Sequence, residues 1–190
     1  MVNARKAFPV GIGLAVASLT LTGVVMAAQP GPGYLAVQSF SAEARNANQV
    51  RLSATAQADI PTRADPFIAG NVIVGIAWAD LGTGTALVAT IHPMLGRDSH
   101  QRKDGWHLHT VQLGGGATAP NDFCLVAVLT TPNAGIQLHG STIKINLGAS
   151  ELPMAGGAVI AAADIDAAVG FTVHGGDAGC ATGLGVRIRT

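Results

Sequence analysis

The feature that most constrains the fold of this chain is a series of short runs rich in Val, Ile, Leu and Thr and separated by segments that contain Gly, Pro, Asn or Asp. Runs of this length and composition predict β-strands. Their spacing of about ten residues is typical of an antiparallel sandwich or barrel, and not of alternating strands and helices. Nine strands are expected: Val50–Ala58, Asn71–Ala79, Thr85–His92, Trp106–Leu113, Phe123–Leu129, Gly135–Leu138, Thr142–Leu147, Gly170–His174 and Gly183–Ile188.

The expected fold class is therefore all-β, with a single antiparallel β-sandwich of Greek-key type and about eight or nine strands. Asp80–Gly84 and Pro132–Gly135 have the composition of hairpin connections. Two segments are ambiguous. Ala36–Ala47 is compatible with a short helix, and the Ala-rich segment Gly156–Ala168 is compatible either with one or two helical turns or with a further strand at its Val159–Ile160 step.

Residues 1–27 have the pattern of a secretory signal peptide. Arg5 and Lys6 form a positively charged n-region. The segment from Ala7 to Ala28 that follows carries no charged residue, and small residues precede a cleavage position after Ala27. The alternative is an uncleaved membrane anchor, because an apolar run of about 20 residues is long enough to span a bilayer. The Gly and Pro residues within the run and the small-residue cleavage position favour cleavage.

Export defines the expected organisation and location of the chain. Residues 1–27 would be removed, residues 28–48 would form a leader or linker, and residues 49–190 would form the β-sandwich domain. The mature protein would be secreted, periplasmic or attached to the cell surface, with no membrane span left after cleavage. Loss of Arg5 and Lys6 changes the formal net charge from 0 to −2. No basic stripe remains, which argues against nucleic-acid binding, and the sequence indicates no protein partner.

The two cysteines of the chain, Cys124 and Cys180, both lie in the mature part. In an oxidising compartment two such residues are expected to form a disulfide bond. The alternative is a pair of buried free thiols.

Histidines carry most of the chemical interest. His107 and His109 are two residues apart in an expected strand, so their side chains project from the same face and are close enough to share one metal ion. Imidazole ligands suit zinc and copper. His174, at the end of another expected strand, is the expected third ligand, and the possible additional ligands are His92, His139 and His100.

The alternative is that these histidines are structural. The face that carries His107 and His109 continues with Val111 and Leu113, so the pair could lie at the margin of an apolar core. His92 precedes a proline and could simply end a strand. His139 and His100, taken singly, have the character of solvent-exposed residues.

Several short segments resemble the copper/zinc superoxide dismutases. The Gly-Trp-His-Leu-His segment ending at His109 is similar to the strand that carries two copper ligands in that family, and Phe171–Asp177 is similar to the late strand that ends in another. The resemblance implies His107, His109 and His174 as copper ligands and a Cys124–Cys180 disulfide. The zinc loop of that family has no counterpart between residues 114 and 143. The exported CHRD-type β domains also share short β runs with a His-x-His strand.

Other catalytic chemistry has little support. No nucleophile elbow, paired catalytic carboxylates, calcium loop or phosphate loop is present. The sequence therefore predicts an exported β-sandwich protein that binds copper or zinc, with superoxide dismutase-like redox activity as the enzymatic extension and simple binding favoured over catalysis. The competing hypothesis is a non-catalytic extracellular or cell-surface module with incidental histidines.

Overall fold

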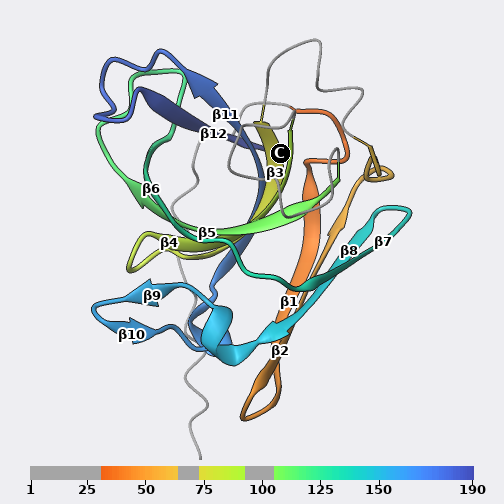
Figure 1. Ribbon diagram of the computed structural model, residues 1–190. Helices are drawn as coiled ribbons and strands as arrows, with labels where there is room; N and C mark the ends of the chain where they lie inside the picture. Colours follow the sequence, from red (N-terminus) through yellow and green to blue (C-terminus); the bar gives the residue numbers. More distant parts are fainter. Residues whose placement is uncertain (1–30, 64–72, 93–104) are drawn as a thin grey trace, which may run out of the picture.

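The computed structural model describes residues 31–63, 73–92 and 105–190 (Figure 1). The segment expected to be a signal peptide lies outside the described residues. The elements are β1 (Val37–Asn46), β2 (Gln49–Ala56), β3 (Ile73–Asp80), β4 (Thr85–Ile91), β5 (His107–Gly114), β6 (Phe123–Thr130), β7 (Gly135–His139), β8 (Thr142–Gly148), β9 (Met154–Ala155), β10 (Ala158–Val159), β11 (Ala167–Gly175) and β12 (Leu184–Arg189), with single 3-10 turns η1 (Ala149–Glu151) and η2 (Ala162–Asp164).

The expected all-β, antiparallel fold is confirmed. Each of the nine predicted runs contains a strand of the structure, and every strand pairing in the described residues is antiparallel. The runs were recognisable because β-branched residues fill the pleated, half-buried surfaces of strands and because turn residues end most of the runs. In the β3–β4 hairpin, for example, the Asp80 carboxylate accepts hydrogen bonds from the amides of Gly82 and Thr83, and Gly84 adopts a φ of 68°.

Two expectations about the N-terminal part are corrected. Residues 36–47 form no helix: β1 covers most of them and pairs with β2 from Val37 to Asn46. Residues 28–48 are therefore not simply a leader or linker, and the folded domain begins before residue 49. Most β1 side chains are exposed, so the strand shows no alternation of apolar and polar residues. Its stability comes from backbone pairing, which sequence periodicity does not report.

One connection also differs from the expectation. Pro132–Gly135 does not close a hairpin, because β6 and β7 belong to different sheets, and the segment carries the chain from one to the other. In the Ala-rich segment both alternatives are partly present: β10 forms a short strand, and η2 forms one 3-10 turn.

The long strands form two layers (Figure 1). One layer is a four-stranded sheet in the order β1-β2-β8-β7. The other is a six-stranded closed barrel in the order β11-β12-β6-β5-β4-β3. The sandwich-like packing of sheet on barrel agrees with the expected layered architecture, but closure of the second layer produces an enclosed interior that an open sandwich lacks.

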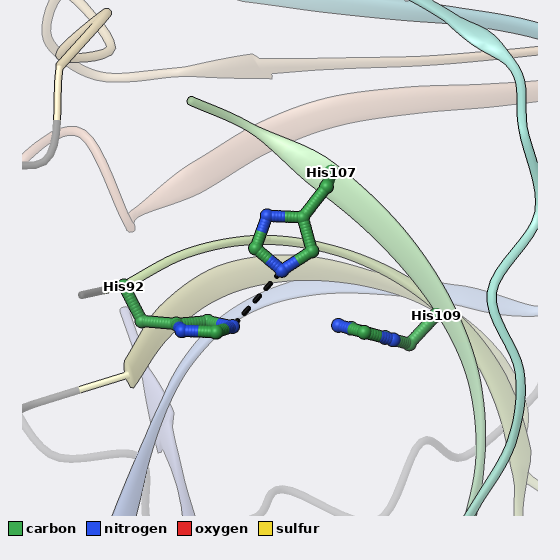
Figure 2. Close-up of side chains that lie close together, drawn as sticks. All are labelled: His92, His107 and His109. Carbon is green, nitrogen blue, oxygen red and sulfur yellow. Dashed lines mark hydrogen bonds between the residues drawn. The ribbon is translucent and has the colours of Figure 1, made fainter. Parts of the chain in front are cut away.

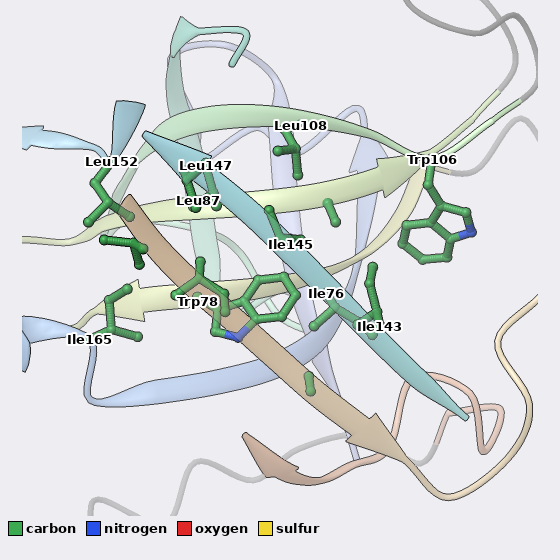
Figure 3. Packing of buried hydrophobic residues seen from close by; sticks show 14 of the residues in the cluster. Ile76, Trp78, Leu87, Trp106, Leu108, Ile143, Ile145, Leu147, Leu152 and Ile165 are labelled. Carbon is green, nitrogen blue, oxygen red and sulfur yellow. The ribbon is translucent and has the colours of Figure 1, made fainter. Parts of the chain in front are cut away.

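The main apolar core lies between the two layers (Figure 3). Ile143 and Ile145 of β8 face Ile76 and Trp78 of β3, and all four side chains have 0% exposure. The Trp78 indole N–H donates a hydrogen bond of 3.1 Å to the backbone carbonyl of Ser53 in β2. Trp78 thus ties barrel to sheet by both apolar packing and a polar contact.

A second apolar cluster lies inside the barrel. Because successive strand residues point to opposite faces, residues that alternate with the inter-layer core point inward. The sixth barrel strand, β6, contributes the partly buried Phe123 and Leu125 to this cluster. The buried members come from the other five strands and are Ala77, Ala79, Ala86, Val88, Val111, Phe171, Val173, Val186 and Ile188.

The Cys124–Cys180 disulfide links β6 to the loop between β11 and β12. The bond closes the barrel where the ladder is shortest, since β6 and β12 share only the two register pairs Gly185–Cys124 and Val186–Phe123. The expected pairing of the cysteines is therefore present in the structure.

We expect the Cys124→Ala/Cys180→Ala double variant to be less stable by about 4 kcal/mol, the chain-entropy value for a loop of this length, given a sequence separation of 56 residues. Urea unfolding of the two proteins would measure the difference. Reduction of the wild-type protein is the control and should lower its stability similarly. A difference below about 1 kcal/mol would contradict a stabilising role for the bond.

Asp177, in the same loop, is almost inaccessible to solvent. Its carboxylate accepts hydrogen bonds from the Thr118 hydroxyl at 2.6 Å, the Asn121 amide at 2.8 Å and the backbone amides of Thr118 and Gly179. These donors, the Thr118 hydroxyl foremost, hold the pKa of Asp177 well below its ordinary range. The network fixes the loop after β5 against the loop after β11.

Stability should consequently depend on this carboxylate at acid pH. Because the pKa of Asp177 is lower in the folded than in the unfolded protein, the carboxylate stabilises the fold above about pH 4, and the contribution is lost as the pH falls further. We expect the stability difference between wild type and Asp177→Asn to be largest at neutral pH and to shrink below about pH 4. Denaturant unfolding at several pH values measures it, and a difference that stays constant with pH would contradict the assignment.

No helix in the described part of the chain has the length and apolar character needed to cross a membrane.

Candidate metal centre

Three histidines meet at one end of the barrel (Figure 2). His107 and His109 lie at the start of β5, and His92 directly follows the last residue of β4. The two strands are paired neighbours, with Thr90 opposite His107 and Val88 opposite His109. Val88 belongs to the cluster inside the barrel, and residues two apart share a face, so all three imidazoles are on the inward side.

The three rings point toward one another and bring their nitrogens together. One nitrogen from each ring lies within 4.8 Å of the other two. His92 Nε2 and His107 Nε2 are 2.9 Å apart, a hydrogen-bond distance. The ring centroids of His107 and His109 are 4.9 Å apart with nearly perpendicular planes, whereas the rings of His92 and His109 are nearly parallel, with an interplanar angle of 18°. Figure 2 shows His92 and His109 on either side of the His107 ring tip.

Backbone and hydroxyl oxygens orient two of the rings. His107 Nδ1 is 3.1 Å from the carbonyl oxygen of Gly105. Since a carbonyl only accepts, Nδ1 must carry the proton and donate it, which leaves Nε2 as the basic nitrogen. Nδ1 of His109 faces the Thr131 hydroxyl at 3.3 Å. Hydrogen bonds of this kind fix the orientation of metal-binding histidines.

The distances suit a small transition-metal ion. With metal–nitrogen bonds of about 2.0–2.1 Å, two ligands of a tetrahedral ion are separated by about 3.3 Å. The His92–His107 distance is 2.9 Å, so these two nitrogens need to move apart by only a few tenths of an ångström. Because His107 Nε2 is the basic nitrogen, His92 Nε2 donates the hydrogen bond between the two rings, and metal binding at His92 Nε2 would displace that proton.

Two of the three histidines are almost completely buried. His92 and His107 are 6% and 5% exposed, and His109 is half-buried. No Asp, Glu or Cys belongs to the group within the described residues. Three neutral imidazoles can therefore hold a divalent cation and leave a fourth position for water or another ligand, as in three-histidine zinc sites.

His174, the expected third ligand, is not part of this group. On β11 the inward side chains are Phe171 and Val173, so His174, one residue further on, points to the outer face. There its Nε2 is hydrogen-bonded to the Thr172 hydroxyl at 2.8 Å, and Arg189 Nε donates to the same hydroxyl oxygen. Burial and the charges of Arg187 and Arg189 lower the pKa of His174. The expectation that His174 completes the site with His107 and His109 is corrected on this geometry.

The other candidate ligands separate clearly. His92 joins the pair and takes the place expected for His174. His139 is exposed at the end of β7, in the four-stranded sheet, and does not belong to the group. His100 lies outside the described residues.

A signal for His92 was present in the sequence. The predicted strand Thr85–His92 ends close to the start of the predicted strand at Trp106, and neighbouring strands in a β protein usually pair. Antiparallel pairing would bring the end of the first strand beside the start of the second. The register that places His92 and His107 diagonally across the ladder is a property of the folded chain.

The fold and the site define an antiparallel β protein with a three-histidine cluster at one end of a closed barrel. No family model, no curated protein and no solved structure matches this chain. The resemblances to copper/zinc superoxide dismutases and to CHRD-type domains remain predictions from sequence.

Proposed function

We propose that this is an exported protein that binds one zinc or copper ion through His92, His107 and His109. The observation that carries the proposal is the convergence of three ring nitrogens within 4.8 Å on two paired strands. Two of the imidazoles are nearly buried, so their positions are fixed by the surrounding strands before any metal arrives. Such preorganisation lowers the entropic cost of binding.

The ligand set supports the choice of metal. Imidazole nitrogens suit zinc and copper, whereas calcium and magnesium need oxygen ligands, and no carboxylate lies in the group within the described residues. Zinc tolerates a three-histidine site with an open position. Copper has the higher intrinsic affinity for such ligands.

Metal titration tests the proposal. We expect the purified mature protein to bind one zinc or copper ion, measured by calorimetry and by metal analysis after gel filtration. The His107→Ala/His109→Ala double variant should bind the ion at least about 100-fold more weakly, because even a residue that only supports a ligand contributes 10–100-fold. His139→Ala is the matched control and should bind like wild type. Equal metal content in the double variant and wild type would overturn the proposal.

Redox chemistry of the superoxide dismutase kind is the enzymatic extension of this proposal, and simple binding is favoured over it. In that family a histidine from the late strand shares the copper with the His-x-His pair, and here the corresponding residue, His174, faces away from the pair. Superoxide consumption by the copper-loaded protein, compared with the His107→Ala/His109→Ala variant, tests the extension directly.

A second candidate is a non-catalytic extracellular or cell-surface interaction module. The observation that favours it is a row of exposed apolar side chains on β6, where Val126, Val128 and Leu129 are 49%, 54% and 44% exposed. Exposed apolar patches often mark interaction sites. In that case the double histidine variant would keep its interactions, and metal removal would have no effect on them.

Export is part of the proposal. The disulfide supports an oxidising compartment, and the pattern of residues 1–27 supports signal cleavage. Mass spectrometry of the protein recovered outside the cytoplasm should give a chain that starts at Ala28. A full-length mass in a membrane fraction would instead indicate an anchor.

A further inference from the structure

The barrel interior is hollow. A cavity of about 820 Å³ lies inside the strands, within the range of about 300–1,000 Å³ found for small-molecule sites. Small side chains, among them Ala77 and Ala79 on β3, are part of its wall. The cavity is called the lumen below.

The lumen wall is almost entirely apolar. Valine, leucine, isoleucine, alanine and phenylalanine side chains form it, and no Asp, Glu, Lys or Arg lines it among the described residues. An apolar ligand that covers this wall would remove apolar surface from water, which favours binding by about 25 cal/mol for each Å² covered. A charged or highly polar molecule would find no partner along the wall.

The polar groups that line the lumen are gathered mainly at one end. Thr90 and His92 come from the end of β4, His109 from the start of β5, and Thr130 and Thr131 from the end of β6. The remaining polar residue of the wall, among those described, is Thr190 at the end of the chain. Hydroxyl and imidazole groups are hydrogen-bonding partners for the head of an amphiphile.

Among the described residues, the lumen wall is exposed to solvent beside these polar groups. Val128 and Leu129 of β6 line the lumen and are largely exposed. The short pairing of β6 with β12 leaves this half of β6 without a ladder partner on the β12 side. A ligand that enters here passes over apolar side chains and keeps its head near His109 and Thr131.

We propose that the lumen binds one long-chain amphiphile of the fatty-acid class, with the tail among the apolar side chains and the carboxylate head at the His109–Thr131 end. A wall of this kind accepts an aliphatic chain, and the clustered polar groups accept a single head. The proposal goes beyond metal binding, because the tail site does not depend on a metal. The three histidines lie at the same end of the lumen as these polar groups, and a carboxylate would be a chemically suitable further ligand for an ion that they held.

Fluorescence titration with cis-parinaric acid, a naturally fluorescent long-chain fatty acid, tests the lumen. We expect saturable binding of one molecule per chain by the purified mature protein. Ala77→Phe and Val88→Phe, which place a ring inside the lumen, should each weaken binding at least about tenfold, which corresponds to about 1.4 kcal/mol. Ala44→Phe on the exposed side of β1 is the matched control and should bind like wild type.

Several results would overturn the proposal. The first is the absence of saturable binding to wild type, which is also expected if another part of the chain fills the lumen. The second is equal binding by wild type and both lumen variants. Circular dichroism and an intact disulfide show whether each variant has folded, and two independent variants protect against the loss of one.

The position of the head is tested separately. We expect wild type to prefer cis-parinaric acid over its methyl ester, and Thr131→Val to reduce that preference. Equal affinity for acid and ester would overturn the proposed orientation.

The metal and the amphiphile are distinguished by the His107→Ala/His109→Ala variant. It should lose the metal and the His109 contact with the head yet keep the tail site, so parinaric acid should still bind, though more weakly. Ala77→Phe, which changes β3 and not a histidine-bearing strand, should still bind zinc. A wild-type protein that binds zinc but no parinaric acid would overturn the lumen proposal and leave the metal proposal standing.

Discussion

Replacement of His92 by alanine should lower the affinity for zinc or copper at least about 100-fold. Residues that only support a metal ligand contribute about 10–100-fold, and a direct ligand should contribute no less. His92 Nε2 lies 2.9 Å from His107 Nε2, so its loss removes one of three converging nitrogens. The variant would leave a two-histidine site in which the ion exchanges with solvent. Calorimetric titration with each metal, in wild type and variant, measures the loss.

His174→Ala is the matched comparison, because it also removes one imidazole from a strand end. We expect its metal affinity to equal that of wild type, since His174 is held on the outer face of β11 by the Thr172 hydroxyl. The opposite pattern, with His174→Ala losing the ion and His92→Ala retaining it, would show that the superoxide dismutase-like ligand set holds and that the cluster in the structure is incidental.

Replacement of Trp78 by alanine should have the largest effect on stability, with a loss of about 3–5 kcal/mol from cavity formation. The side chain has 0% exposure and fills the space between the barrel and the four-stranded sheet (Figure 3). Its removal also leaves the Ser53 carbonyl, which accepts the indole N–H, without that donor. A loss of this size approaches the whole stability of many domains, which is about 5–15 kcal/mol.

Urea unfolding of three variants separates the contributions. Trp78→Phe keeps most of the ring volume but loses the hydrogen bond, so its free energy of unfolding should lie between those of wild type and Trp78→Ala. Phe40→Ala on β1, where the ring is 40% exposed, is the control and should cost less than about 1 kcal/mol. If Trp78→Ala proves no more destabilising than Phe40→Ala, the packing of sheet on barrel is not what stabilises this protein.

Much of the secondary structure was predictable because its causes are local. Most of the predicted runs end at Gly, Pro, Asn or Asp and are rich in β-branched residues, so the strands could be located one by one. β1 was missed for the converse reason. Its side chains are mostly exposed, so they show no apolar pattern. The strand is held by backbone pairing with β2, and the composition of β1 does not reveal that pairing.

The candidate site was predictable in part. That His107 and His109 share a face follows from the two-residue period of a strand, which any pairing preserves. Membership of the third histidine does not follow from any local rule. His92 joins because β4 pairs with β5 in the register that places Thr90 opposite His107. His174 is not in the cluster because the odd-numbered residues of β11, Phe171 and Val173, point into the barrel. Packing against the other strands determines which face of β11 points inward, and the sequence of β11 alone does not.

The sequence by itself thus determined most of the strands, the antiparallel all-β class, the common face of His107 and His109 and the pair of cysteines available for a disulfide. These depend on neighbouring residues and on composition. Tertiary structure alone decided that the second layer closes into a barrel, that the barrel is hollow and that His92 completes the cluster. Closure and register depend on contacts between residues far apart in the chain, such as Gly185 with Cys124. Their free energy is shared over many strand pairs and is not carried by any one segment.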